Sequence, residues 1–125
     1  MRVELTKYRV KEGKNELVDE WIEYMHNHMD DVLMNLEGEK MFVETIFREA
    51  FNDVEYLYWY SVQDDNQPED KISKADLDEK HLEYWERCID KTFRPEDMKA
   101  EIVMIPERIR PVSYTHLTLP TICSV

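Results

Sequence analysis

Two neighbouring stretches of the chain, residues 40–51 and 55–63, are rich in aromatic and β-branched side chains, and only the polar link Asn52-Asp53-Val54 separates them. Segments of this composition and length favour β-strands, and so short a polar link is typical of a hairpin. The chain is therefore expected to contain an antiparallel sheet, and the other elements must be placed around it.

Two further strands and two helices are expected around this hairpin. Residues 2–10 alternate between apolar and polar side chains, as a strand with one buried face does. Residues 15–36 carry apolar side chains at helical spacing and Gly38 ends the pattern, which predicts one long amphipathic helix. A second helix is predicted over residues 76–90, and a short apolar strand over residues 101–105.

The resulting order is strand, helix, strand, strand, helix, strand, within a single domain of residues 1–111. This is the split βαβ order of α+β, ferredoxin-like folds, in which two helices pack on one face of a four-stranded antiparallel sheet. The alternation is interpreted as placing Val3, Leu5, Val43, Thr45, Phe47, Leu57, Trp59, Val103 and Ile105 toward the helices, and Tyr8, Phe42, Glu44, Ile46, Arg48, Tyr56, Tyr58, Tyr60, Ile102 and Met104 on the other face. That second face is too apolar to be left in water. We therefore expect a homodimer that pairs two sheets face to face around a barrel-like, partly polar interior.

The balance of charge excludes several classes of partner. The 125 residues carry 28 Asp plus Glu against 16 Lys plus Arg, a net charge of −12. Such an excess of acid disfavours nucleic acids, whose binding relies on cations, and also anionic membrane surfaces. Apolar runs stay well short of the roughly 20 residues of a transmembrane helix and no signal sequence is recognised, so a cytoplasmic protein is expected.

Two segments differ in composition from the rest of the chain. Residues 63–75 are acidic, contain Pro68 and offer little to bury, which predicts a surface loop that could act as a lid. Residues 112–125 carry no charge at all, and their first ten residues, VSYTHLTLPT, resemble one translated reading frame of a transposon end and adapter used in sequencing libraries. We therefore expect residues 112–125 to be a non-native tail.

The chain resembles a small uncharacterised bacterial family of about this length in five segments, residues 3–5, 41–49, 56–61, 81–85 and 103–108. More widely, the chain resembles the dimeric α/β-barrel superfamily, which includes antibiotic-biosynthesis monooxygenase-like proteins. The resemblance implies ferredoxin-like subunits that dimerise and, if the protein is an enzyme, cofactor-independent monooxygenase or isomerase chemistry. No activity can be carried over from the close family, so the chemistry has to be sought in particular residues.

His81 lies in the middle of the apolar stripe of the 76–90 helix, beside Tyr84. A neutral imidazole in that place could serve as a general base, with its pKa tuned by burial and by a neighbouring carboxylate. The alternative is a core histidine that is held by one hydrogen bond.

Glu44 and Arg48 are four residues apart on one expected strand and therefore share a face. They could bind and orient a polar ligand inside the barrel, or they could form an ion pair across the dimer interface. Tyr58 and Tyr60 alternate along the next strand, and together with Tyr84 their hydroxyl-bearing rings could hold a small aromatic or amphipathic molecule. Packing between subunits is the alternative for the strand tyrosines, because interfaces are enriched in tyrosine.

Neither a cofactor nor a metal is indicated. His26 and His28 point in nearly opposite directions on a continuous helix, and no other His or Cys has the spacing of zinc ligands. The two glycines of the chain cannot build a P-loop or a dinucleotide fingerprint. Two functions stay open: a homodimer that binds or transforms a small aromatic or amphipathic molecule in its barrel interior, and a non-catalytic structural dimer.

Overall fold

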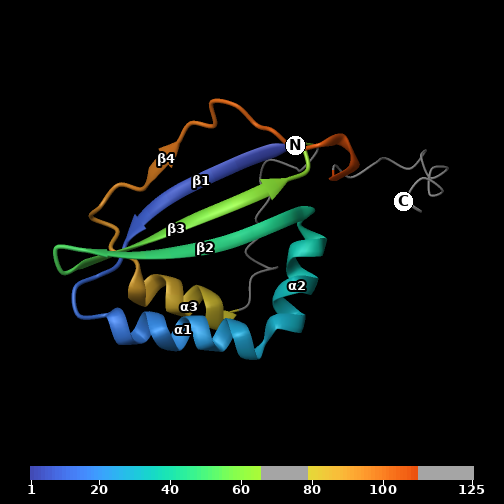
Figure 1. The fold of residues 1–125 in the computed structure, drawn as a ribbon. Coiled ribbons are helices and arrows are strands. Elements are labelled where there is room, and N and C mark those ends of the chain that lie inside the picture. Colours follow the sequence, from blue (N-terminus) through green and yellow to red (C-terminus); the bar gives the residue numbers. More distant parts are fainter. Residues whose placement is uncertain (66–78, 110–125) are drawn as a thin grey trace.

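The computed structural model has one four-stranded sheet with helices packed on one face (Figure 1). It describes residues 1–65 and 79–109. In chain order the elements are β1 (Arg2–Arg9), α1 (Asn15–Asn27), α2 (Met29–Gly38), β2 (Met41–Phe51), β3 (Val54–Gln63), α3 (Glu79–Cys88), β4 (Glu96–Met98) and the 3₁₀ turn η2 (Glu107–Ile109). The α+β class and the four-stranded antiparallel sheet are confirmed, while the described residues form three α-helices instead of two.

The strands lie in the order β2-β3-β1-β4, and every neighbouring pair is antiparallel. The expected hairpin joins β2 to β3. Asn52 and Asp53 take left-handed backbone angles at the tip, with φ of 54° and 63°. Asn and Asp tolerate this conformation better than most residues, and two successive left-handed residues give a turn whose twist matches that of the strands. The polar link is therefore a specific hairpin turn.

The helical stretch predicted as one element is divided into α1 and α2 at His28. The backbone of His28 leaves the helical region, with φ −121° and ψ 33°, although the neighbouring residues include neither glycine nor proline. Its ring Nδ1 donates a hydrogen bond of 2.9 Å to the carbonyl of Tyr24, and the two rings stack with centroids 4.1 Å apart. After this break α2 turns toward β2 (Figure 1) and ends at Gly38, as expected.

The fourth strand lies earlier in the chain than predicted. β4 pairs with β1, whereas residues 101–105 have no regular structure and Met104 is exposed. A polar contact contributes to the pairing, because the hydroxyl of Thr6 donates to Oδ1 of Asp97 at 2.7 Å. The prediction of a strand at 101–105 was wrong because β4, with the sequence Glu-Asp-Met, lacks the apolar pattern by which strands are recognised.

The two faces of the sheet also differ from expectation. On β3 the prediction is right, since Trp59 packs against Trp21 of α1 with ring centroids 5.8 Å apart. On β2, however, Glu44 and Arg48 point toward the helices, because Glu44 accepts a hydrogen bond from Trp59 and Arg48 is bonded to Asp19 of α1.

The face assignments of β1 and β2 are therefore the reverse of those predicted. Tyr8 packs against Trp85 of α3, so it lies on the helix side, while Leu5 lies beside Tyr58 and Tyr60 on the open side. Both sets of alternate residues on these strands contain large apolar side chains, so alternation alone does not decide which set is covered.

The buried core lies between the sheet and the pair α1 and α3. Its members are Val10, Val18, Trp21, Leu57, Tyr84, Cys88 and Ile89. Burial raises the pKa of the Cys88 thiol, which behaves as a small apolar side chain. The core does not continue beneath α2, which has no buried residue.

Three expectations fall wholly or mainly outside the described residues: the start of the second helix at Asp76, the acidic loop beyond Asp65 and the tail at 112–125. Within residues 1–65 and 79–109, no helix combines the length and the apolar character that crossing a membrane requires.

Candidate functional site

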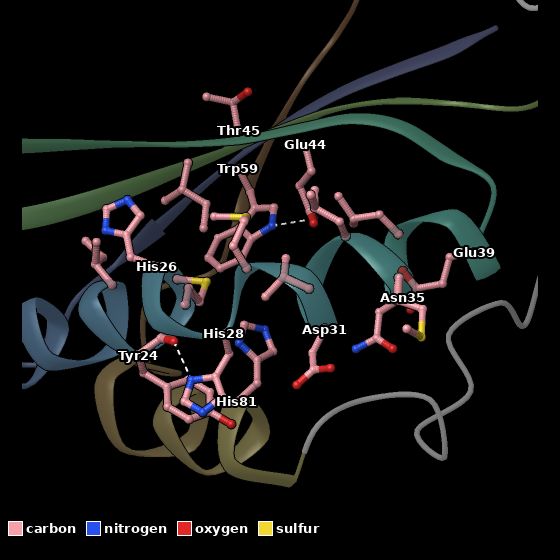
Figure 2. A pocket seen from close by; sticks show the side chains of 18 residues that line it. Tyr24, His26, His28, Asp31, Asn35, Glu39, Glu44, Thr45, Trp59 and His81 are labelled. Carbon is pink, nitrogen blue, oxygen red and sulfur yellow. Dashed lines mark hydrogen bonds between the residues drawn. The ribbon is translucent and has the colours of Figure 1, made fainter.

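A cleft of about 740 Å³ lies where the core stops, between α2, the ends of α1 and α3, and the sheet (Figure 2). Its volume is that of a typical small-molecule site. The apolar part of its wall includes Ile22, Met25, Met29, Val32, Leu36 and Ile46. The cleft exists because the break at His28 swings α2 out of line with α1, so that α2 covers the sheet without packing tightly on it.

Glu44 supplies the carboxyl group of this cleft. It projects from β2 on the helix side, and its Oε2 accepts a hydrogen bond of 2.7 Å from Nε1 of Trp59 on β3 (Figure 2). Burial raises the pKa of the Glu44 carboxyl, and the hydrogen bond from Trp59 offsets part of this rise. Within residues 1–65 and 79–109 no Lys or Arg forms an ion pair with it.

His81 enters the same cleft from α3, and Figure 2 shows it on the helix side while Glu44 lies on the strand side. Its Nδ1 accepts a hydrogen bond of 3.0 Å from Nε1 of Trp21. Because Nδ1 is an acceptor, the neutral ring carries its proton on Nε2 and offers a donor there. This arrangement favours the packed, hydrogen-bonded histidine over the general base.

Arg48 has different surroundings from Glu44, although the two share a strand face. Its guanidinium binds the carboxylates of Asp19 at 2.6 Å and of Glu55 at 2.9 Å, and it donates to the carbonyl of Asn15 at 3.0 Å. All three partners belong to the same chain. Arg48 therefore fastens β2 to the start of α1 and to β3, and it does not line the cleft.

Tyr58 and Tyr60 lie on the open face of the sheet, away from the cleft. With Leu5 and Phe47 they line a separate, shallower hollow of about 380 Å³. The hydroxyl of Tyr58 donates to Oε1 of Glu49 at 2.6 Å, and this hydrogen bond raises the pKa of Tyr58. The strand tyrosines therefore cannot contact a ligand that is bound beside Glu44.

Tyr84 belongs to the core beneath α3. Its hydroxyl donates to Oε2 of Glu20 at 2.9 Å, and burial, followed by this hydrogen bond, raises its pKa. Of the six residues singled out in the sequence, the structure brings only Glu44 and His81 to one cleft.

Sequence reasoning missed several residues of the cleft, above all Trp59 and Tyr24. The strand alternation places Trp59 only on the helix side of the sheet, and the apolar stripe of α2 is typical of one continuous packed helix. His26 and His28 both belong to the wall of the cleft, at well separated positions in Figure 2. Across the described residues, no group of three or more His, Cys, Asp or Glu is placed to hold a metal ion.

Comparison with known proteins places the chain in a family without identifying an activity. No curated protein and no solved structure matches the chain. One family model matches it over residues 1–111, the segment that contains all the described helices and strands. This agrees with the resemblance to an uncharacterised family, and the chain therefore belongs to the family of unknown function DUF6176.

Proposed function

We propose that this protein binds a small apolar molecule with a polar head in the cleft between α2 and the sheet. The observation that supports the proposal is a half-buried carboxyl group, Glu44, which projects into a cavity of about 740 Å³ and has a single hydrogen bond within the described residues. Enclosed polar groups normally have their hydrogen bonds satisfied, and a ligand head would complete those of Glu44. The apolar wall would bury the rest of the molecule.

Binding is better supported than catalysis. Monooxygenase or isomerase chemistry without a cofactor, which the sequence resemblance implies, needs a group that takes a proton from the substrate. Nδ1 of His81 is occupied by the Trp21 hydrogen bond. Glu44, with its raised pKa, is the better proton acceptor if the ligand is also transformed.

We propose in addition that the fold is ferredoxin-like. The sheet order β2-β3-β1-β4 with antiparallel neighbours, and the position of α1 and α3 together on one face (Figure 1), support this assignment. The third helix, α2, is an addition that forms a wall of the cleft.

A homodimer that pairs the open faces of two sheets is a second proposal, and it is compatible with ligand binding. Phe47 on this face is 55% exposed, although it is surrounded by the apolar and aromatic side chains Leu5, Tyr58 and Tyr60. Contiguous apolar surface of this kind is typical of interfaces. Glu44 and Arg48 point away from it, so this interface would not contain the pair that the sequence suggested.

Dye binding tests the cleft. We expect N-phenyl-naphthylamine, a neutral apolar dye, to bind the full chain at one site per chain with a rise in fluorescence. Ile46→Trp fills the cleft and should abolish this binding, and Val32→Phe, on the opposite wall, gives an independent filling variant. Phe47→Trp is the matched control, because the neighbouring residue on the same strand faces the other way. Loss of dye binding in Phe47→Trp alone would place the site on the open face and contradict the proposal.

Light scattering coupled to size exclusion tests the dimer. We expect Phe47→Lys to convert a dimer into a monomer, because a charge would be placed in the apolar interface. Leu33→Lys is the matched control, since Leu33 on α2 is 53% exposed and equally apolar. A monomeric wild-type protein, or dissociation by Leu33→Lys instead of Phe47→Lys, would refute the open-face dimer.

A further inference from the structure

We infer that the head of the ligand is a cation, an ammonium group on an apolar body that forms an ion pair with Glu44. This inference rests on the proposed function, because it requires that the cleft be the binding site. It goes further by naming the charge and the chemical class of the occupant.

A comparison of the enclosed carboxylates carries the argument. Glu55 is 13% exposed and binds Arg48 at 2.9 Å, and Asp90 is 22% exposed and binds Arg9 at 3.0 Å. Glu44 is enclosed like these two, but within the described part of the chain its one partner is the neutral indole of Trp59. Charges removed from water are normally paired in proteins, because an unpaired one is costly. A cationic ligand would supply the missing partner.

The charge of the remaining wall agrees with this assignment. Asp31 and Glu39 add two more acidic side chains, and none of the described wall residues is Lys or Arg. An acidic cleft raises the local concentration of cations and repels anions, and the net charge of −12 acts in the same direction. His26, His28 and His81 also line the cleft, so binding is best compared at about pH 8, above the pKa of a free imidazole.

The rest of the wall selects an apolar body over a highly charged one. Trp59 and Tyr24 present aromatic rings, on which cations bind favourably. The methionines Met25 and Met29 and the aliphatic Val32 offer adaptable apolar surface. An aromatic or aliphatic monoamine satisfies both parts of the wall, whereas a polyamine would bring additional charges against hydrocarbon.

Displacement of the dye by three naphthalene compounds tests the charge of the head. The amine naphthylethylamine, the neutral naphthylethanol and the anion naphthylacetate share one ring system and differ in the head group. At pH 8, we expect the amine to displace N-phenyl-naphthylamine at a concentration at least about tenfold lower than the alcohol, with the acid weakest, since about 1.4 kcal/mol of ion pairing gives tenfold in affinity. Glu44→Gln should bring the amine to the level of the alcohol while leaving the alcohol almost unchanged.

Glu49→Gln is the matched control, because Glu49 lies on the same strand, faces the other way and accepts a hydrogen bond from Tyr58. This variant should retain the full preference for the amine. Equal displacement by amine and alcohol, or a preference that survives Glu44→Gln, would overturn the cation assignment while the binding site stands. Failure of the dye itself to bind would instead remove the proposed function.

Discussion

Glu44 and Arg48 lie four residues apart on the same strand and the same sheet face. The surroundings of the two residues nevertheless differ. At the Arg48 end, ion pairs to Asp19 and Glu55 close the space between strand and helix. At the Glu44 end, a cleft separates the strand from α2, and the described residues provide no counter-ion. The comparison shows that the covering helix decides whether a charged strand residue becomes part of the scaffold or part of a site.

The difference follows from how the two helices are anchored. α1 inserts Val18 and Trp21, both fully buried, into the core. α2 inserts no buried residue and begins at the break at His28. Because burial of large apolar side chains is the main stabilising term, α1 is held firmly against the sheet and α2 only loosely.

The largest expected effect is a difference in stability between truncations of an apolar side chain beside Arg48 and of one beside the cleft. Leu57→Ala, beside Arg48 in the strand register, should lower the free energy of unfolding by about 2–5 kcal/mol, because Leu57 is fully buried. Ile46→Ala, beside the cleft, should cost about 1 kcal/mol or less, because the side chain is only partly covered. Urea denaturation measures both. Equal losses would mean that the two ends are packed alike.

Removing the cation of Arg48 should have the next largest effect on stability. Arg48→Met leaves Glu55 enclosed without its partner and should cost about 1–3 kcal/mol of stability. Adding Glu55→Gln should recover part of that loss. Dye binding in the cleft should be unaffected, since Arg48 does not line it. A variant that unfolds no more easily than wild type would show that the ion pairs do not fasten this end.

Removing the charge of Glu44, at the cleft, should raise the stability of the protein instead of lowering it. The pKa of Glu44 is raised in the folded protein, so between its unfolded and folded values the folded state binds more protons, and stability falls as pH rises through this window. Glu44→Gln removes that loss and keeps an acceptor for Trp59. At pH 7 its melting temperature should therefore rise by a few degrees, the effect of about 0.5–1 kcal/mol in a domain of this size.

Thermal denaturation over a range of pH checks the sign. The advantage of Glu44→Gln should shrink on acidification and vanish below about pH 4, where an ordinary glutamate is protonated in both states. A gain that is independent of pH would show that the enclosed charge is not its source. Glu49→Gln, on the open face, should show no such dependence.

The smallest effect concerns the break that creates the cleft. His28→Ala removes the hydrogen bond from Nδ1 to the carbonyl of Tyr24 and the stacking of the two rings. Since His28 is exposed, the loss of stability should be about 0.5 kcal/mol, and dye affinity should change by no more than about threefold. Loss of dye binding without loss of stability would show that the side chain of His28 itself holds the cleft in shape.

The sequence predicted elements more reliably than their relations. The hairpin and the ends of the apolar helical stretch were recognisable because each depends on local turn chemistry or on periodicity. The helix break at His28 is not marked by glycine or proline, and β4 is polar. Neither element therefore has a sequence pattern from which it could be predicted. The faces of β1 and β2 were reversed because both sets of alternate residues include large apolar side chains.

For the candidate site, too, the sequence indicated suitable residue types but not their positions relative to one another. Glu44 and His81 were selected as residue types able to carry charge and protons, and both lie in the cleft. Arg48, Tyr58 and Tyr84 were selected on the same grounds, and the structure places them in an ion-pair cluster, on the open face and in the core. Trp59, which orients Glu44, was hidden among the aromatic residues of a strand.

By itself, the sequence determined an acidic α+β domain with an antiparallel hairpin, amphipathic helices and a small aromatic core, because composition and periodicity control these properties residue by residue. Only the tertiary structure decided that Glu44 faces a cleft while Arg48, four residues away, is closed off by Asp19 and Glu55. The physical reason is that a carboxylate acquires its chemistry from desolvation and from its nearest charges, and both depend on which helix lies above the strand.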